Sequence, residues 1–174
     1  METLVDILAN FPIKKVDLSN CVCLHEKSIL HVIQQFGKTI AELNLSSLQV
    51  TENVMVEIAN HVPSLQRLIL RKCNLTSEVV LTWAPKLWNR IGKNSISVPA
   101  NLEELDLEGN PQLEDDTILA LLKRLPKLQK ANLKSCSITE EAIEAIKTMN
   151  PALELLHTAG DLGISHPLSV SSAY

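Results

Sequence analysis

The amino-acid sequence predicts an α/β fold: a short right-handed solenoid with a parallel β-sheet on its concave face and helices on its convex face. Three observations predict this fold. One apolar motif recurs along the 174 residues, a helical period of apolar residues follows its copies, and prolines fall at one phase of the repeat. A unit of this size cannot bury its apolar face alone, so about five to six units must stack.

The recurring motif reads Leu-x-x-Leu-x-Leu-x-x-Cys, with other apolar residues at some of the leucine positions. Its alternation indicates a short strand whose leucines point into the core. This is the leucine-rich repeat pattern. Successive copies start 27, 25, 37, 26 and 25 residues apart, so the third repeat carries about eleven extra residues. The copies lie at 13–21, 40–48, 65–73, 102–110 and 128–136, and a frayed sixth copy begins at Leu153.

Helices are predicted between the strands, because apolar residues recur there with a helical period. Helix starts are marked by a hydroxyl near the N-cap, followed by acidic residues, at Thr51, Thr76 and Thr139. Helix ends are marked by prolines shortly before the next strand, at Pro12, Pro63, Pro99, Pro126 and Pro151. The expected buried faces are Val54, Met55, Ile58 and Val62 in the second repeat, Ile118, Leu121, Leu122 and Leu125 in the fourth, and Ala142, Ile143, Ile146 and Met149 in the fifth.

The predicted organisation has three parts. Residues 1–12 are expected to form an N-terminal capping helix or a partial repeat, 13–158 the leucine-rich repeat domain with an insertion near 83–100, and 159–174 a C-terminal tail. The insertion region holds both tryptophans. Trp83 is expected to pack on neighbouring repeats. Trp88 is open to two interpretations, packing or a binding anchor, because Trp is favoured at protein interfaces.

The composition narrows the classes of function. The net charge of −4 argues against general nucleic-acid binding. The sequence has no run of 18 apolar residues that would predict a membrane span. Its first twelve residues do not resemble a secretory signal. We therefore expect the chain in the cytosol or the nucleus. The sequence has no phosphate-binding loop, no metal-ligand set and no nucleophile motif. We therefore expect a protein without catalytic activity, metal or cofactor.

Three of the four cysteines occupy one phase of the repeat, at Cys21, Cys73 and Cys136. Residues at that phase are expected to face the core, so we interpret them as small apolar side chains with a weak S–H donor. Disulfides are not expected between stacked equivalents. The pair Cys21 and Cys23 has the wrong gap for a zinc site and no second pair at ligand spacing.

Charged residues are predicted on the concave face, at strand positions that alternate with the leucines. They can neutralise one another as a ladder across the sheet, which is the favoured interpretation, or form a docking surface. Alternating signs suit a protein or peptide better than a nucleic acid. The candidate partner-binding residues are Arg67, Arg71, Glu104, Glu108, Lys130, Lys134 and Trp88. Two residues after each motif start the series is Lys15, Glu42, Arg67, Glu104 and Lys130, and six residues after it the series is Ser19, Ser46, Arg71, Glu108 and Lys134.

Segments such as Cys73-Asn-Leu75-Thr76 and Cys136-Ser-Ile138-Thr139 resemble the cysteine-containing class of leucine-rich repeats over residues 13–158. That class is typical of F-box/LRR proteins, the substrate-recognition subunits of cullin-type ubiquitin ligases. The resemblance implies a non-catalytic module that binds a protein partner. The sequence has no recognisable F-box, so ubiquitin-ligase components would join through another chain or segment. Leu48 and Asn110 depart from the pattern by replacing the cysteine.

Two other interpretations remain open. The chain could be a structural subunit of a larger multiprotein assembly. It could also be a hydrolase inhibitor of the ribonuclease-inhibitor type, which the period near 26 residues and the few cysteines disfavour.

Overall fold

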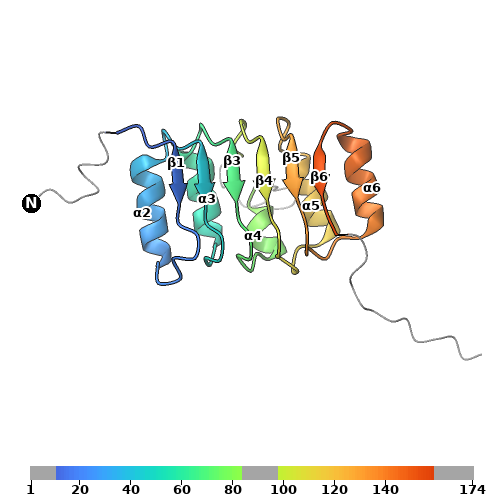
Figure 1. Ribbon diagram of the computed structural model, residues 1–174, viewed down its shortest axis with the longest axis horizontal. Coiled ribbons are helices and arrows are strands. Elements are labelled where there is room, and N and C mark those ends of the chain that lie inside the picture. Colours follow the sequence, from blue (N-terminus) through green and yellow to red (C-terminus); the bar gives the residue numbers. More distant parts are fainter. Residues whose placement is uncertain (1–10, 84–97, 159–174) are drawn as a thin grey trace, which may run out of the picture.

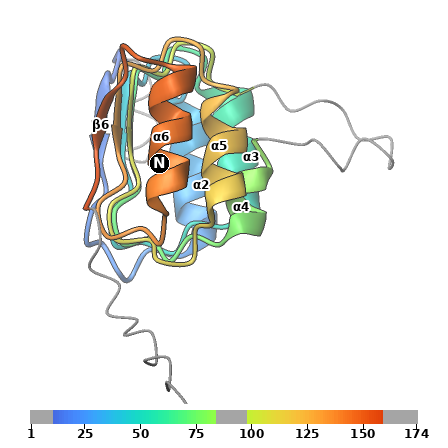
Figure 2. The same cartoon turned by 90° about the vertical axis from the view of Figure 1, so that its right-hand side faces the viewer.

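The computed structural model describes residues 11–83 and 98–158. It shows a six-stranded parallel sheet, with the strands side by side in chain order. The helices cover one face of this sheet and leave the other face open (Figures 1 and 2). This architecture confirms the predicted solenoid. The strands are β1 (Lys15–Asp17), β2 (Glu42–Asn44), β3 (Arg67–Ile69), β4 (Glu104–Asp106), β5 (Lys130–Asn132) and β6 (Glu154–Leu156), and the helices are α2 (Glu26–Phe36), α3 (Glu52–His61), α4 (Ser77–Leu81), α5 (Asp115–Leu122) and α6 (Glu140–Met149).

The first five strands pair at equivalent motif positions, and β6 continues the sheet, so one apolar row runs along its inside. Its members are Val16, Leu43, Leu68, Leu105, Ala131 and Leu155. The long third repeat does not disturb this register, because Leu68 and Leu105 pair as their equivalents do elsewhere. Among the described residues, no helix is long and apolar enough to cross a membrane.

The sixth repeat keeps its strand but reaches it one residue early. The Leu153 N–H donates to the Asn150 carbonyl, as the Leu128 N–H donates to the Leu125 carbonyl. Glu154 then pairs with Lys130, the second residue after Leu128. The predicted start at Leu153 therefore matches the turn that precedes the strand. Strand β6 begins one residue after Leu153, whereas β5 begins two residues after Leu128.

The predicted helix caps are present. The hydroxyls of Thr51, Thr76 and Thr139 accept from the backbone N–H three residues ahead, at 3.4, 3.5 and 3.2 Å. The predicted apolar faces are largely buried, but Met149 is 39% exposed. Burial was the wrong expectation for Met149, whose side chain lines an open groove between the last turns of α5 and α6.

Trp83 packs as predicted. Its side chain is fully buried, and its indole N–H donates to the Met55 carbonyl of the preceding repeat at 2.8 Å. Most of the insertion predicted near 83–100 lies outside the described residues. Trp88 lies outside the described residues.

The cysteine position links each repeat to the one before it. The Cys73 thiol donates to the Leu45 carbonyl and the Cys136 thiol to the Leu107 carbonyl, both at 3.2 Å. Burial raises the pKa of the Cys73 thiol to about 11 and also raises that of Cys136. Cys21 is exposed, so the prediction that it faces the core was wrong. Its repeat is the first one described, so within residues 11–83 and 98–158 no earlier repeat offers a carbonyl to its thiol.

Asn110 takes the cysteine position in the fourth repeat and forms a stronger link. It is fully buried and makes four hydrogen bonds. Its side-chain oxygen accepts from the N–H groups of Cys73 and Leu75, both at 3.1 Å. Its amide donates to the carbonyls of Leu70 and Leu107 at 2.8 and 2.7 Å. One side chain thus satisfies backbone groups of two repeats.

We predict that Asn110→Ala lowers the free energy of unfolding by about 2–4 kcal/mol, because it leaves several buried backbone groups without partners. Asn110→Cys should lose less, since a thiol at this position still donates one bond in two other repeats. The control is Asn53→Ala, an exposed residue of α3 with a single side-chain bond to Glu26. Urea unfolding measures all three. Equal midpoints for Asn110→Ala and the parent protein would contradict the prediction.

We also predict that the native protein exposes two fast-reacting thiols, Cys21 and Cys23, to an aromatic disulfide reagent near pH 8. Cys73 and Cys136 should react only after unfolding, because they are buried and their raised pKa keeps them as thiols. Reaction of the protein in concentrated urea gives the reference value for all four thiols. Rapid reaction of all four in the native protein would contradict the assignment.

Candidate functional site

The outermost charges of the concave face form a row at the first residue of each strand. We call this the first row: Lys15, Glu42, Arg67, Glu104, Lys130 and Glu154. It resolves into three ion pairs between neighbouring strands, Lys15–Glu42 at 2.9 Å, Arg67–Glu104 at 2.8 Å and Lys130–Glu154 at 2.9 Å. The ladder expected across the sheet is therefore present. These side chains are largely exposed, so solvent and salt weaken each pair.

The pairing is reflected in the titration of two members of the row. The hydrogen bond from Lys15 lowers the pKa of Glu42, although partial desolvation opposes the shift. The hydrogen bond to Glu154 raises the pKa of Lys130. Both shifts favour the charged forms.

A middle row lies two residues further along each strand, and it was missing from the predicted set. Its members are Asp17, Asn44, Ile69, Asp106, Asn132 and Leu156. In four repeats the side-chain oxygen accepts from the N–H two residues ahead, at 2.9, 3.0, 3.1 and 3.2 Å. These bonds turn the chain as it leaves the strand. Alternation along the strand would have revealed the row, since its positions lie between the two predicted series.

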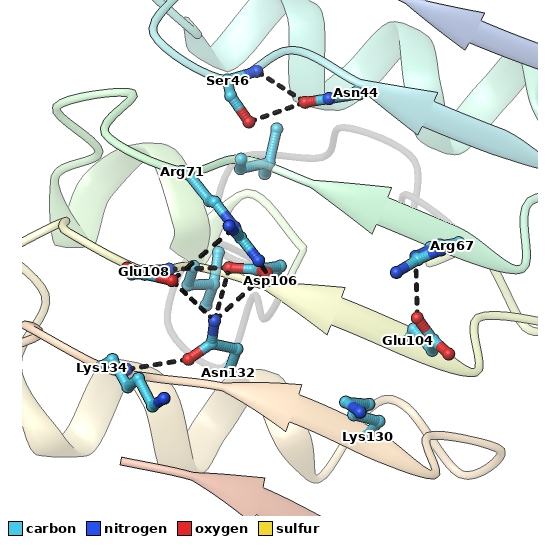
Figure 3. A network of polar contacts seen from close by, with 12 residues as sticks. Asn44, Ser46, Arg67, Arg71, Glu104, Asp106, Glu108, Lys130, Asn132 and Lys134 are labelled. Carbon is cyan, nitrogen blue, oxygen red and sulfur yellow. Dashed lines mark hydrogen bonds and ion pairs between the residues drawn. The ribbon is translucent and has the colours of Figure 1, made fainter. Parts of the chain in front are cut away.

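The middle of the concave face holds a network that we call the central cluster: Arg71, Asp106, Glu108 and Asn132 (Figure 3). The Arg71 guanidinium contacts Asp106 Oδ2 through Nε at 2.8 Å and Nη2 at 2.7 Å, and its Nε lies 3.7 Å from Glu108. The Asn132 amide donates to both Asp106 oxygens at 3.2 Å and to Glu108 at 2.9 Å. One cation and one amide thus hold two carboxylates together.

Burial differs across the central cluster. Asn132 is only 5% exposed, whereas half of the Arg71 side chain remains accessible. The hydrogen bond to Asp106 raises the pKa of Arg71 further above its already high value. The cluster therefore has a fixed buried side and a half-exposed arginine side chain that can still meet a ligand.

The structure brings some of the predicted residues together and separates others. Arg71 and Glu108 lie in the central cluster, with Asp106 and Asn132, which the prediction missed. Arg67 and Glu104 pair at the other end of the same two strands, and Lys130 pairs with Glu154. The Lys134 backbone N–H donates to Asn132. Within residues 11–83 and 98–158, the Lys134 ammonium forms no ion pair.

Ile69 interrupts the middle row beside Arg71. It cannot close the strand-end turn as an Asp or Asn does, and it places a half-buried apolar side chain between Asn44 and Asp106. The concave face thus combines an apolar spot with an exposed cation. In the described part of the chain, no group of His, Cys, Asp and Glu is arranged to hold a metal ion.

We predict that Arg71→Met lowers the free energy of unfolding by roughly 1–2 kcal/mol, because Asp106 and Glu108 then face each other without a cation. Lys15→Met, which removes one exposed pair at the end of the ladder, should lose clearly less. Adding Asp106→Asn to Arg71→Met should recover part of the loss, since it removes one of the two negative charges. Urea unfolding measures the series. Equal losses for the two single variants would show that the central cluster is no stronger than an isolated pair.

Comparisons with known proteins yield similar folds but no family. No family model matches the sequence, and no curated protein matches it significantly. The actin-binding site 2 structure of leiomodin-1 is similar over 91% of this chain and 81% of that one, with 10% identity and a TM-score of 0.41. A chain of the yeast Rad7–Elc1 complex is similar over 83% of this chain, with 17% identity and a TM-score of 0.40. The match spans 56% of that chain. Identities this low do not establish a shared function.

Proposed function

We propose that this chain is a non-catalytic protein-binding module that recognises its partner with the concave face around the central cluster. The observation that carries the proposal is the half-exposed Arg71 side chain, held by Asp106 and Glu108 next to the apolar Ile69. Parallel strands fix these groups in place, so binding does not have to order them first. Solenoids offer such extended surfaces to partners.

The charges of the face restrict the partner. Glu104 and Glu108 stand between the basic residues, and they would repel the evenly spaced phosphates of a nucleic acid. A protein segment can match the alternation, with a carboxylate toward Arg71 or Lys134 and an apolar side chain on Ile69. Because the ladder is already paired, such contacts favour the correct partner over others more than they add affinity.

A finer proposal is that the module recognises substrates within a ubiquitin-ligase complex, in the cytosol or the nucleus. The resemblance to the cysteine-containing repeats of F-box/LRR proteins supports it, together with the thiols of Cys73 and Cys136 that link successive repeats. Ligase components would then bind through another chain or segment. The chain would contribute the concave face that contacts the substrate.

A second candidate is a structural subunit of a larger assembly. The β1 end of the sheet favours it, because Phe11 and Val22 are 61% and 74% exposed there. The inward-facing Val16 and Leu18 are also only half-buried. A stacked neighbour would cover this end.

We predict that a photo-crosslinking amino acid placed at Lys134 captures a discrete protein partner from a eukaryotic lysate. The same group at Glu144, an exposed position of α6, should not. Adding Ile69→Asp with Arg71→Glu should remove the Lys134 adduct. The matched control exchanges the charges of one ladder pair, Lys15→Glu with Glu42→Lys, and should keep it.

The outcomes separate the candidates. Mass spectrometry of the adduct identifies the partner, and cullin or adaptor proteins in the same uncrosslinked complex would support the ligase proposal. An adduct formed from Val22 but not from Lys134 would favour the assembly subunit. Equal adducts from Lys134 and Glu144 would contradict a binding role for the concave face.

A further inference from the structure

The middle row of the concave face has two apolar members, Ile69 on β3 and Leu156 on β6. Its other four members are Asp or Asn, whose side-chain oxygens accept from the backbone N–H two residues ahead. Ile69 and Leu156 have no oxygen for that bond. Both are only half-buried. Within residues 11–83 and 98–158, neither belongs to the apolar core or packs against it. Their side chains are therefore apolar surface on an otherwise polar row.

Leu156 faces the concave side because β6 begins one residue early. The spacing of Leu153 and Leu156 is that of the first two motif leucines, which would turn Leu156 inward. In the structure Leu155 pairs with Ala131 and Leu156 with Asn132. A shift of one residue moves a strand side chain to the opposite face of the sheet. Leu155 consequently packs against the core, and Leu156 joins the middle row.

The two apolar residues stand on either side of the central cluster. The register places Ile69 beside Asp106, Asp106 beside Asn132, and Asn132 beside Leu156. With neighbouring strands about 4.8 Å apart, the row extends roughly 14 Å from Ile69 to Leu156. It therefore reads apolar, acid, amide, apolar across four strands.

This spacing matches an extended protein segment that crosses the strands. An extended chain advances about 3.4 Å per residue and presents every second side chain to the same side, so residues four positions apart lie roughly 14 Å apart. On a helix, residues four positions apart are only about 6 Å from each other. The side chain midway along the extended segment would lie over Asp106 and Asn132.

The centre of the row carries an excess of negative charge. Asp106 and Glu108 share the single Arg71 guanidinium, and the first-row charges beside them are already paired. Glu108 is the more accessible carboxylate, with 32% of its side chain exposed against 15% for Asp106. A basic side chain midway between the two apolar residues can therefore pair with Glu108 and balance the excess.

We propose that the middle row from Ile69 to Leu156 binds an extended segment of a partner protein, with two apolar residues four positions apart and Lys or Arg midway between them. One apolar side chain packs on Ile69 and the other on Leu156, and the basic side chain pairs with Glu108. The proposal rests on the proposed function and adds the sequence pattern that the concave face recognises. An acidic residue of the partner then pairs with Lys134 rather than with Arg71, which already serves two carboxylates.

Fluorescent peptides of three kinds test the pattern against the full chain. The first kind is polar except for two apolar residues four positions apart, with Lys midway. The second replaces the Lys with Glu, and the third moves one apolar residue by a single position, which turns it to the other side of an extended segment. Anisotropy measures affinity, and NMR of the isotope-labelled chain locates the contact. We expect the first kind to bind roughly tenfold more tightly than the others and to shift the amides of Ile69, Glu108 and Leu156.

Two variants remove the apolar contacts and preserve the turns. Ile69→Asn and Leu156→Asn introduce the side chain that Asn44 and Asn132 have in the same row, so the new oxygen can accept from the N–H two residues ahead. Each should weaken binding of the first peptide roughly tenfold, because one apolar side chain loses its contact. The matched control is Asp17→Asn, in the same row but outside the stretch from β3 to β6, and it should leave affinity unchanged. Circular dichroism confirms that each variant is folded.

A third variant tests the charge at the centre. Glu108→Gln removes the excess negative charge, so the preference for Lys over Glu midway along the peptide should disappear. Asp17→Asn again serves as the control, because it also removes one negative charge from the middle row. An unchanged preference in Glu108→Gln would contradict the assigned ion pair.

Failure of this proposal is distinguishable from failure of the proposed function. Equal affinity for the three kinds of peptide, or no binding of the first kind, would overturn the pattern. A partner captured through Lys134 whose adduct survives Leu156→Asn would also overturn it, while the concave face would remain the binding surface. Equal adducts from Lys134 and Glu144, together with no peptide binding, would contradict both proposals.

Discussion

One backbone hydrogen bond, repeated between neighbouring strands, holds the molecule in order. The N–H of the residue after each strand donates to the last carbonyl of the next strand, from Leu18 to Asn44, and the same bond recurs at every later step. Its length stays between 2.7 and 2.9 Å across all five steps. Because this bond keeps the repeats in register, equal positions lie about 4.8 Å apart. Because of that spacing, side chains at equal motif positions form rows across the sheet, with an apolar row inside and charged rows outside.

The rows explain why the sequence predicts the interior well and the ends less well. A threonine cap needs only its own repeat. A buried leucine or the ion pair of Arg67 with Glu104 needs only the next repeat, which the periodicity supplies. Cys21 lies in the first described repeat, and Met149 lies in the last turn of α6, the last described helix. Periodicity carries no information about the ends of the stack, so both were predicted buried and both are exposed.

The candidate site was predictable in its charges but not in its polar framework. The alternation of sign located Arg71 and Glu108. It did not locate Asp106 or Asn132, whose side chains bond locally to the chain leaving the strand and also reach across the sheet. Residues with such a double role look like turn formers in the sequence. Their contribution to a surface becomes visible only when strands are placed side by side.

The junction after Trp83 has a consequence for how such a chain can change over evolutionary time. Trp83 closes its repeat by bonding to Met55, and the chain re-enters the stack where the Asn101 amide donates to the Pro63 carbonyl at 3.1 Å. Both anchors hold onto the preceding repeat, so the register of β3 with β4 is independent of the length between them. Added length between two fixed ends of a chain raises the entropic cost of closure only slowly. Natural variation can therefore lengthen, shorten or rewrite this connection while every other repeat keeps its place.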